Sequence, residues 1–131
     1  MKITLLAGAL LLLPALTTTL SARGATVGPT RGVASWYGEA HRGRLMANGK
    51  RFNPDKLTAA SWFFPLGSRV RVTVLMPDSQ IERSVTVTIT DRGPARRLVR
   101  RHRIIDLTHA AFKELAHPDL GLVHVKVEPE E

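Results

Sequence analysis

Apolar and polar residues alternate in RVRVTV at residues 69–74 and again in VTVTIT at residues 85–90. A period of two is the pattern of a β-strand with one buried face, so the valines of the first stretch are expected to face a core. Pro77-Asp78-Ser79, which separates the two stretches, is typical of a turn. The two stretches are therefore predicted to pair as antiparallel strands.

Other segments carry weaker signals of secondary structure. The further strands that we expect are Val33–Tyr37, Leu57–Ala60, Ile104–Leu107 and Leu122–Val127. Thr108 is a typical helix N-cap and predicts a short helix over His109–Leu115. Six short strands with one or two short helices indicate an all-β domain, because a small β protein removes its exposed edges by closing into a barrel or a sandwich. Alternation alone does not choose between the two.

The N-terminus has the pattern of a secretory signal peptide. Lys2 precedes an apolar run from Ile3 to Leu16, and small residues follow up to Ala25. This run is short for a hydrocarbon core of about 30 Å. We expect a signal peptide at 1–25 with an unassigned cleavage bond; the alternative is an uncleaved membrane anchor. Cleavage would give an exported protein with no membrane span, in the periplasm or cell envelope.

The rest of the 131-residue chain has room for one domain. We expect a linker at 26–31, which is rich in Gly, Pro and Thr, a single domain at 32–128 and an acidic tail at 129–131. The oligomeric state cannot be predicted from these features.

Composition narrows the chemistry. The chain has no cysteine, which excludes disulfides, thiolate metal sites, a thiol nucleophile and a lipid-modified N-terminal cysteine. No His, Asp and Glu spacing fits a metal site, and neither a metal nor a cofactor is expected. The net charge of +8 favours polyanions such as nucleic acid, anionic lipid or cell wall. Because the chain is predicted to be exported, nucleic acid is not an expected partner.

Several motifs occur together in one order and resemble the rare lipoprotein A family. They are Gly32–Gly38 (GVASWYG), Ala47–Gly49 (ANG), Arg51-Phe52, Leu57–Ala60 (LTAA), Pro65–Gly67 (PLG), Thr90–Pro94 (TDRGP) and Ile104–Thr108 (IIDLT). The resemblance extends from Gly32 to Val127. It implies a six-stranded double-psi β-barrel, related to expansins.

The resemblance also implies an activity. Members of the family are endolytic transglycosylases that cleave peptidoglycan glycan strands lacking stem peptides and leave 1,6-anhydro-muramic ends. Such a reaction needs an acid for the glycosidic oxygen and a base for the sugar's own 6-hydroxyl, and one carboxyl group can serve both steps. The alternative is a non-catalytic, expansin-like domain that binds glycan strands in the envelope.

Two aspartates are the candidate catalytic residues. Asp91 stands where a predicted strand meets a Gly-Pro turn and matches the family's acid; the alternative is a turn aspartate that caps nearby amides. Asp106 lies inside an apolar run, where an unpaired charge is costly; the alternative is a structural aspartate at the start of the short helix. If both reach one groove, their repulsion is expected to raise the pKa of one of them.

The chain departs from the family at three positions. Ser61 stands where the family has a site histidine, Met46 where it tends to have threonine, and Lys50 where it has glutamate. These differences weaken the catalytic assignment more than the fold. His41, His102, His109 and His117 are at other positions and are expected at the surface.

Tyr37, Ser61, Arg92 and Trp36 are the candidate substrate-binding residues. Arg92 could instead steady the Asp91 carboxylate. Trp36, Tyr37, Trp62 and Phe63 could stack on sugar rings, although at least two of them are expected in the core. Five arginines between Arg96 and Arg103 form a basic segment that could hold carboxylates or phosphates; the alternative is a solvated loop.

Overall fold

The computed structural model describes residues 28–76 and 81–131. The predicted signal peptide at 1–25 and the turn at Pro77-Asp78-Ser79 lie outside the described residues. The linker predicted at 26–31 is described only from residue 28 onward.

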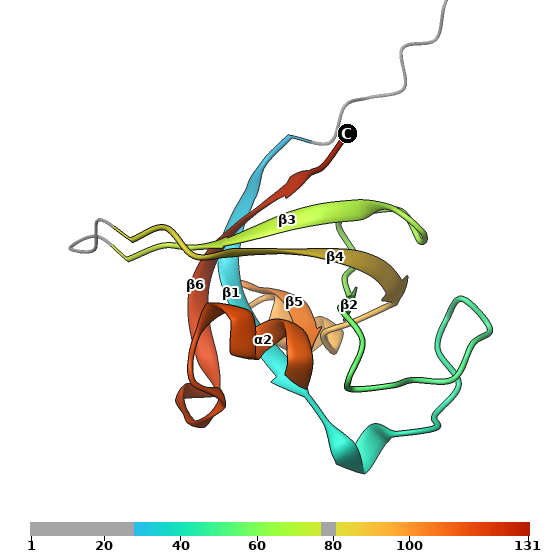
Figure 1. Ribbon diagram of the computed structural model, residues 1–131. Coiled ribbons are helices and arrows are strands. Elements are labelled where there is room, and N and C mark those ends of the chain that lie inside the picture. Colours follow the sequence, from blue (N-terminus) through green and yellow to red (C-terminus); the bar gives the residue numbers. More distant parts are fainter. Residues whose placement is uncertain (1–27, 77–80) are drawn as a thin grey trace, which may run out of the picture.

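The described residues form a small β domain with short helices at its margins (Figure 1). The strands are β1 (Thr30–Tyr37), β2 (Thr58–Ala60), β3 (Arg69–Val74), β4 (Ser84–Asp91), β5 (Arg103–Thr108) and β6 (Leu122–Pro129). The helices are α1 (Arg96–Val99) and α2 (His109–Leu115), with single 3-10 turns η1 (Glu39–His41) and η2 (Pro118–Leu120).

The six strands close into one barrel in the order β1-β5-β2-β4-β3-β6. Two neighbouring pairs, β1 with β5 and β2 with β4, are parallel, and the other pairs are antiparallel. The predicted antiparallel pairing of β3 with β4 is confirmed. The all-β barrel with two short helices is confirmed as well.

The barrel core is built from the apolar face of each strand. Val70 and Val72 of β3 are fully buried and Val74 is nearly so, as the alternation predicted. Phe112 and Leu115 of α2 complete the core, because the helix packs against the barrel (Figure 1). The predicted N-cap of α2 is confirmed: the Ala111 amide donates to the Thr108 hydroxyl at 3.2 Å.

The strands extend further than the sequence predicted. β1 begins at Thr30, inside the expected linker, because residues 30–32 pair with β6. β6 runs on to Pro129, the first residue of the expected tail, because Pro129 lies opposite Val70 of β3.

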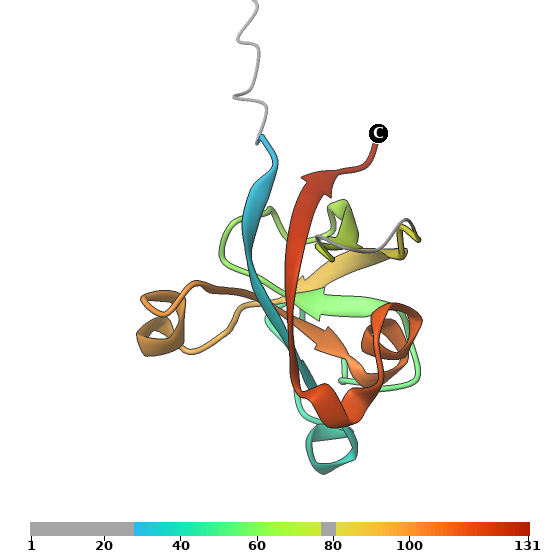
Figure 2. The ribbon, with the colours of Figure 1, turned by 90° about the vertical axis from the view of Figure 1, so that its left-hand side faces the viewer.

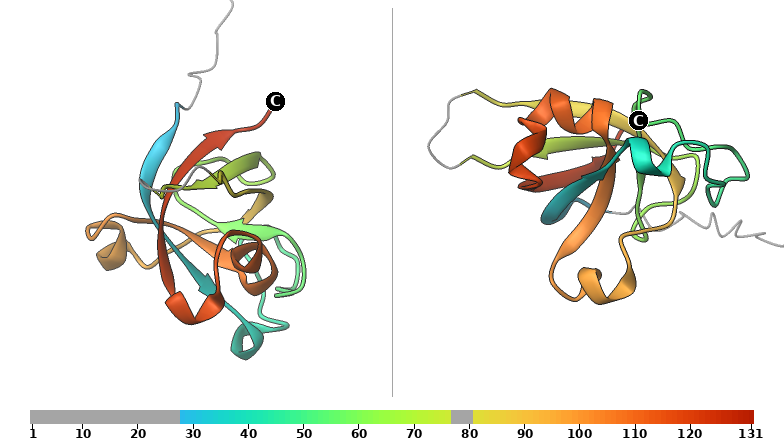
Figure 3. Two further views of the ribbon diagram at one scale, coloured as in Figure 1. Left: turned by 60° about the vertical axis from the view of Figure 1, so that its left-hand side comes forward. Right: turned by 90° about the horizontal axis from the view of Figure 1, so that it is seen from below.

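The basic segment forms a protrusion with one turn of helix, α1. It leaves the barrel after β4 and returns into β5, on the side away from α2 (Figures 2 and 3). The amide of Val33 donates to the His102 carbonyl at 2.8 Å and fixes the returning end. A Cβ on Gly32 would lie 2.6 Å from that carbonyl, so only glycine permits this approach.

Candidate functional site

The two candidate aspartates lie in one row across three adjacent strands. Asp106 of β5 and Asp91 of β4 both lie opposite Ala60 of the intervening strand β2. Neighbouring strands are about 4.8 Å apart, so the two Cα atoms are separated by roughly 10 Å. Ser35 of β1 continues the row, since it lies opposite Asp106.

A register irregularity gives Asp91 its place in this row. Ala59 pairs with Ile89, but Ala60 pairs with Asp91, so β4 has one residue more than β2 at this point. Strict alternation would have put Asp91 on the core face together with Ile89. The extra residue is typical of a β-bulge, which redirects a side chain at the end of a strand.

The turn after Asp91 passes beside the second carboxylate. A Cβ on Gly93 would lie 3.4 Å from the Oδ2 atom of Asp106 and 3.3 Å from the Cβ of Ala60. The backbone of Gly93 therefore lies close to both Ala60 and Asp106.

Asp91 binds amides and takes part in no ion pair within the described residues. Its Oδ1 atom accepts from the amides of Ala47 at 2.9 Å and Arg92 at 2.8 Å. This is the amide-capping arrangement that the sequence left as an alternative. It leaves Oδ2 without a hydrogen-bond partner in residues 28–76 and 81–131.

The Asp106 side chain is 22% exposed and has two polar partners. Its Oδ1 atom accepts from the hydroxyl of Ser35 and lies 3.6 Å from the Arg103 guanidinium. Burial raises the pKa of Asp106, against the opposing effects of Ser35 and Arg103. The expected cause, repulsion from Asp91, was wrong. The helix-start alternative was also wrong, because Thr108 caps α2.

Tyr37 connects the two carboxylates electrostatically. Its hydroxyl is buried and has no hydrogen-bond partner among the described residues. Burial raises the pKa of Tyr37 most, and the charges of Asp91 and Asp106 raise it further. The phenol therefore stays neutral and can donate a strong hydrogen bond to an anion or a polarised oxygen. Its ring is held by stacking on Phe52, at a centroid distance of 4.2 Å.

His41 is a member of this group that the sequence interpretation missed. It was expected at the surface, but it is half-buried, and its Nδ1 atom is buried without a hydrogen-bond partner among the described residues. Its ring meets Tyr37 edge-on at 5.6 Å, and its charge acts on Asp106. No sequence signal marks it, because only the turn η1 brings it back toward β1.

Ser61 and Arg92 have structural roles at the base of the site. Ser61 is fully buried, and its hydroxyl donates to the Ile104 carbonyl at 3.0 Å. The Arg92 guanidinium donates to the carbonyls of Ser61 at 2.7 Å and Phe64 at 2.6 Å. The expected substrate contact of Ser61 would require its hydroxyl to become exposed. Arg92 steadies Asp91 through its backbone amide and not through its charge.

Trp36 lies on the opposite face of β1 from Ser35 and Tyr37. Its indole N–H donates to the Pro118 carbonyl at 2.9 Å, and its ring contacts His109 at 4.9 Å. The ring packs against the core on the side of α2. Strand β1 therefore separates the Trp36 ring from the aspartate row.

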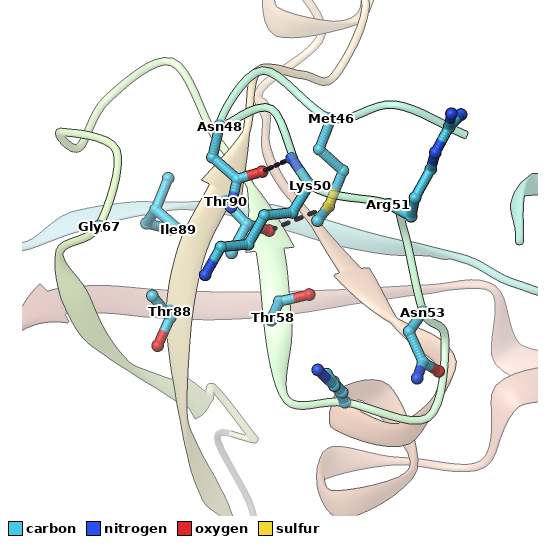
Figure 4. Close-up of a pocket in the computed structure, with 11 residues that line it drawn as sticks. Met46, Asn48, Lys50, Arg51, Asn53, Thr58, Gly67, Thr88, Ile89 and Thr90 are labelled. Carbon is cyan, nitrogen blue, oxygen red and sulfur yellow. Dashed lines mark hydrogen bonds between the residues drawn. The ribbon is translucent and has the colours of Figure 1, made fainter. Parts of the chain in front are cut away.

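A cavity of about 360 Å³ adjoins the loop that binds Asp91. Its lining residues are Met46, Asn48, Lys50, Arg51, Asn53, Lys56, Thr58, Gly67, Thr88, Ile89 and Thr90. Figure 4 shows the Lys50 side chain extending over the cavity, whereas Arg51 points away from it. The Met46 sulfur accepts from the Thr90 hydroxyl at 3.4 Å, so this departure from the family contributes to packing beside Asp91.

The residues that the structure describes contain no cluster of metal-binding side chains and no helix suited to span a membrane. No three side chains among His, Asp and Glu gather closely enough in this part of the chain to hold a metal ion. None of its helices is both long enough and apolar enough to cross a membrane.

A family model described as "Lytic transglycolase" matches residues 30–127, which include the whole barrel up to Val127. The chain belongs to this family. Its relatives include proteins named endolytic peptidoglycan transglycosylase RlpA. The Pseudomonas aeruginosa protein is 42% identical over 97 residues, covering 74% of this chain and 26% of the relative. The Neisseria meningitidis protein is 39% identical over 97 residues, covering 74% of this chain and 37% of the relative.

A Nostoc protein named probable endolytic peptidoglycan transglycosylase RlpA is 42% identical over 100 residues. That match covers 75% of this chain and 25% of the relative, so the chain spans about a quarter of the length of this relative.

Solved structures share the fold. The Streptomyces papain inhibitor has a TM-score of 0.60 and 23% identity, covering 82% of this chain and 98% of the inhibitor. A variant of Clavibacter michiganensis expansin in complex with cellohexaose has a TM-score of 0.55 and 17% identity. The match covers 79% of this chain and 50% of the expansin. At these identities the likeness concerns the double-psi barrel fold only.

Proposed function

We propose that the chain is an exported endolytic transglycosylase that cleaves peptidoglycan glycan strands lacking stem peptides and forms 1,6-anhydro-muramic ends. The proposal includes a signal peptide at 1–25 and action in the periplasm or cell envelope. The observation that carries it is the row of Asp91 and Asp106 beside the unpartnered Tyr37 hydroxyl. Family membership and the names of the relatives support it.

In this proposal, Asp91 performs both proton transfers. Its carboxyl group protonates the glycosidic oxygen as the bond from that oxygen to the anomeric carbon breaks. The resulting carboxylate then takes the proton of the 6-hydroxyl as that oxygen bonds to the anomeric carbon, so protons balance and no water is consumed. The assignment to Asp91 is supported by its Oδ2 atom, which accepts no hydrogen bond among the described residues.

Asp106, Tyr37 and His41 form the surroundings of that reaction. The neutral Tyr37 hydroxyl donates to an oxygen whose negative charge increases in the transition state. Burial raises the pKa of Asp106. The Asp106 carboxylate interacts electrostatically with both Tyr37 and His41. Because Ser61 is buried and bonded, we assign the role of the family's histidine to His41, whose ring contacts Tyr37.

The test is to incubate the purified protein with peptide-free glycan strands and to measure 1,6-anhydro ends by mass spectrometry. We expect Asp91→Asn to lower the rate by at least about 1,000-fold and Asp106→Asn by about 10- to 100-fold. Full activity of Asp91→Asn together with an inactive Asp106→Asn would reverse the assignment of the two residues.

A non-catalytic glycan-binding domain is the second candidate. The burial of the Ser61 hydroxyl favours it, because no proton-transfer group stands at the position of the family's histidine. Retention of the strands without any anhydro ends would identify this function.

A further inference from the structure

The basic protrusion forms one side of a second cavity, which lies outside the site described above. This cavity, of about 490 Å³, is lined by Trp62, Arg96, Val99 and Arg100. Trp62 is 42% exposed, although a tryptophan is usually more buried. The Arg96 guanidinium lies over the Trp62 ring, 4.6 Å from its centroid.

Trp62 is fixed next to Asp91. Its indole N–H donates to the carbonyl of Pro94 at 2.7 Å, in the turn that follows Asp91. The preceding residue, Ser61, donates its amide to the Asp91 carbonyl at 3.1 Å. The other end of the protrusion reaches Arg103, which pairs with Asp106. The two ends of the protrusion are therefore held close to Asp91 and Asp106, respectively.

Four of the five arginines of the basic segment have no acidic partner among the described residues. Arg96, Arg97, Arg100 and Arg101 are exposed, and none of them forms an ion pair within residues 28–76 and 81–131. Arg42, by contrast, binds both Glu39 and Asp55. An unpaired guanidinium presents a planar fork of donors that matches a carboxylate.

We propose that Trp62, Arg96 and Arg100 form a subsite for the acidic sugar of the glycan strand. This inference rests on the proposed function. The flat face of the sugar stacks on the face of the indole that Arg96 does not cover, and the lactyl carboxylate of muramic acid binds the forks of Arg96 and Arg100. A neutral glycan would leave both guanidinium groups without a partner. The subsite thus selects strands by their carboxylates and seats an acidic sugar beside Asp91.

Binding is measured with the Asp91→Asn protein, so that strands stay intact. The probes are peptide-free glycan strands, the same strands with their carboxylates amidated, and chitin oligosaccharides of equal length. The double variant Arg96→Ala/Arg100→Ala is expected to bind the acidic strands about tenfold more weakly, and the two neutral probes with little change. The matched control Arg69→Ala/Arg83→Ala removes two exposed arginines near β3 and β4 and should change affinity by less than about twofold.

Equal loss in the control, or equal binding of acidic and amidated strands, overturns the subsite. So does binding to phosphatidylglycerol vesicles through Arg96 and Arg100 without discrimination among the glycans, which would indicate a membrane surface. Cleavage by the unaltered protein separates the two proposals. Normal anhydro ends with an unchanged KM in the double variant would leave the function standing and remove the subsite. If the protein discriminates between acidic and neutral strands in binding but cleaves none of them, the subsite stands and the proposed function falls.

Discussion

The Tyr37 hydroxyl is a buried polar group that the fold leaves without a partner among the described residues. Such a group costs stability, since it has lost its water and gained no hydrogen bond. Its ring, by contrast, is held by Phe52 and His41. A group of this kind, on which the charges of Asp91 and Asp106 both act, is explained if its partner is the substrate.

Replacing Tyr37 by Phe therefore separates activity from stability. We expect the rate of anhydro-end formation to fall by about 100-fold, because one donor to the transition state is lost. The free energy of unfolding should stay equal or rise, because the stacked ring is kept and the unpartnered hydroxyl is removed. Rate measurements and urea unfolding check the two parts, and a large loss of stability would show that the hydroxyl is structural.

The raised pKa of Asp106 should make the stability of the protein depend on pH. Because its folded pKa is raised by burial, its contribution to stability is fully present below the unfolded value of about 3.9 and is lost as the pH rises through the raised pKa. Asn cannot titrate but can still accept from Ser35. The variant Asp106→Asn should therefore be more stable than the unaltered protein at pH 7, and the difference should shrink toward pH 4. Thermal unfolding across this range tests it, and an unchanged difference at all pH values contradicts it.

At the scale of elements, the loop of residues 45–51 positions the Asp91 carboxylate. Leu45 and Arg51 form an isolated bridge, and the amide of Gly49 closes the loop onto the Met46 carbonyl at 2.9 Å. The loop presents the Ala47 amide to Asp91. Gly49 has a φ of 84°, which favours glycine strongly over residues with a Cβ.

Gly49→Ala is expected to cost about 1–2 kcal/mol of stability through backbone strain. It should also lower the rate about tenfold, because a displaced Ala47 amide shifts Asp91. Gly121→Ala is the matched control: its φ is 68°, a Cβ on either glycine would meet no atom within 4 Å, and Gly121 lies before β6. The control should lose similar stability but keep its rate, and equal rate losses would contradict the role of the loop.

The elements differ in how far their sequence could specify them. β3 and β4 were predicted because alternation is local, and the N-cap at Thr108 was predicted for the same reason. The row of Asp91 and Asp106 could only be a hypothesis from the sequence, because it depends on a register irregularity between strands distant in sequence. The His41 position and the buried hydroxyl of Ser61 depend on contacts that no local pattern encodes.

For the whole molecule, β6 closes the barrel by pairing with β1 on one side and β3 on the other. Val125 shows this role: it is fully buried and lies opposite both Gly32 and Val74. Every strand therefore has two neighbours, and the aspartate row is supported by a sheet without free edges. The geometry of the site therefore depends on the whole barrel being closed.

Two truncations test where the functional unit begins. A protein of residues 28–131 keeps all of β1 and should unfold in one cooperative transition and form anhydro ends. A protein of residues 32–131, which starts at the boundary predicted from sequence, loses the pairs of Thr30 with Val127 and of Arg31 with Lys126. It should be less stable by about 1–2 kcal/mol and equally active when folded, because the aspartate row is untouched. Equal stability would place the start of the domain at Gly32, and a folded but inactive 28–131 protein would mean that the barrel alone binds strands without cleaving them.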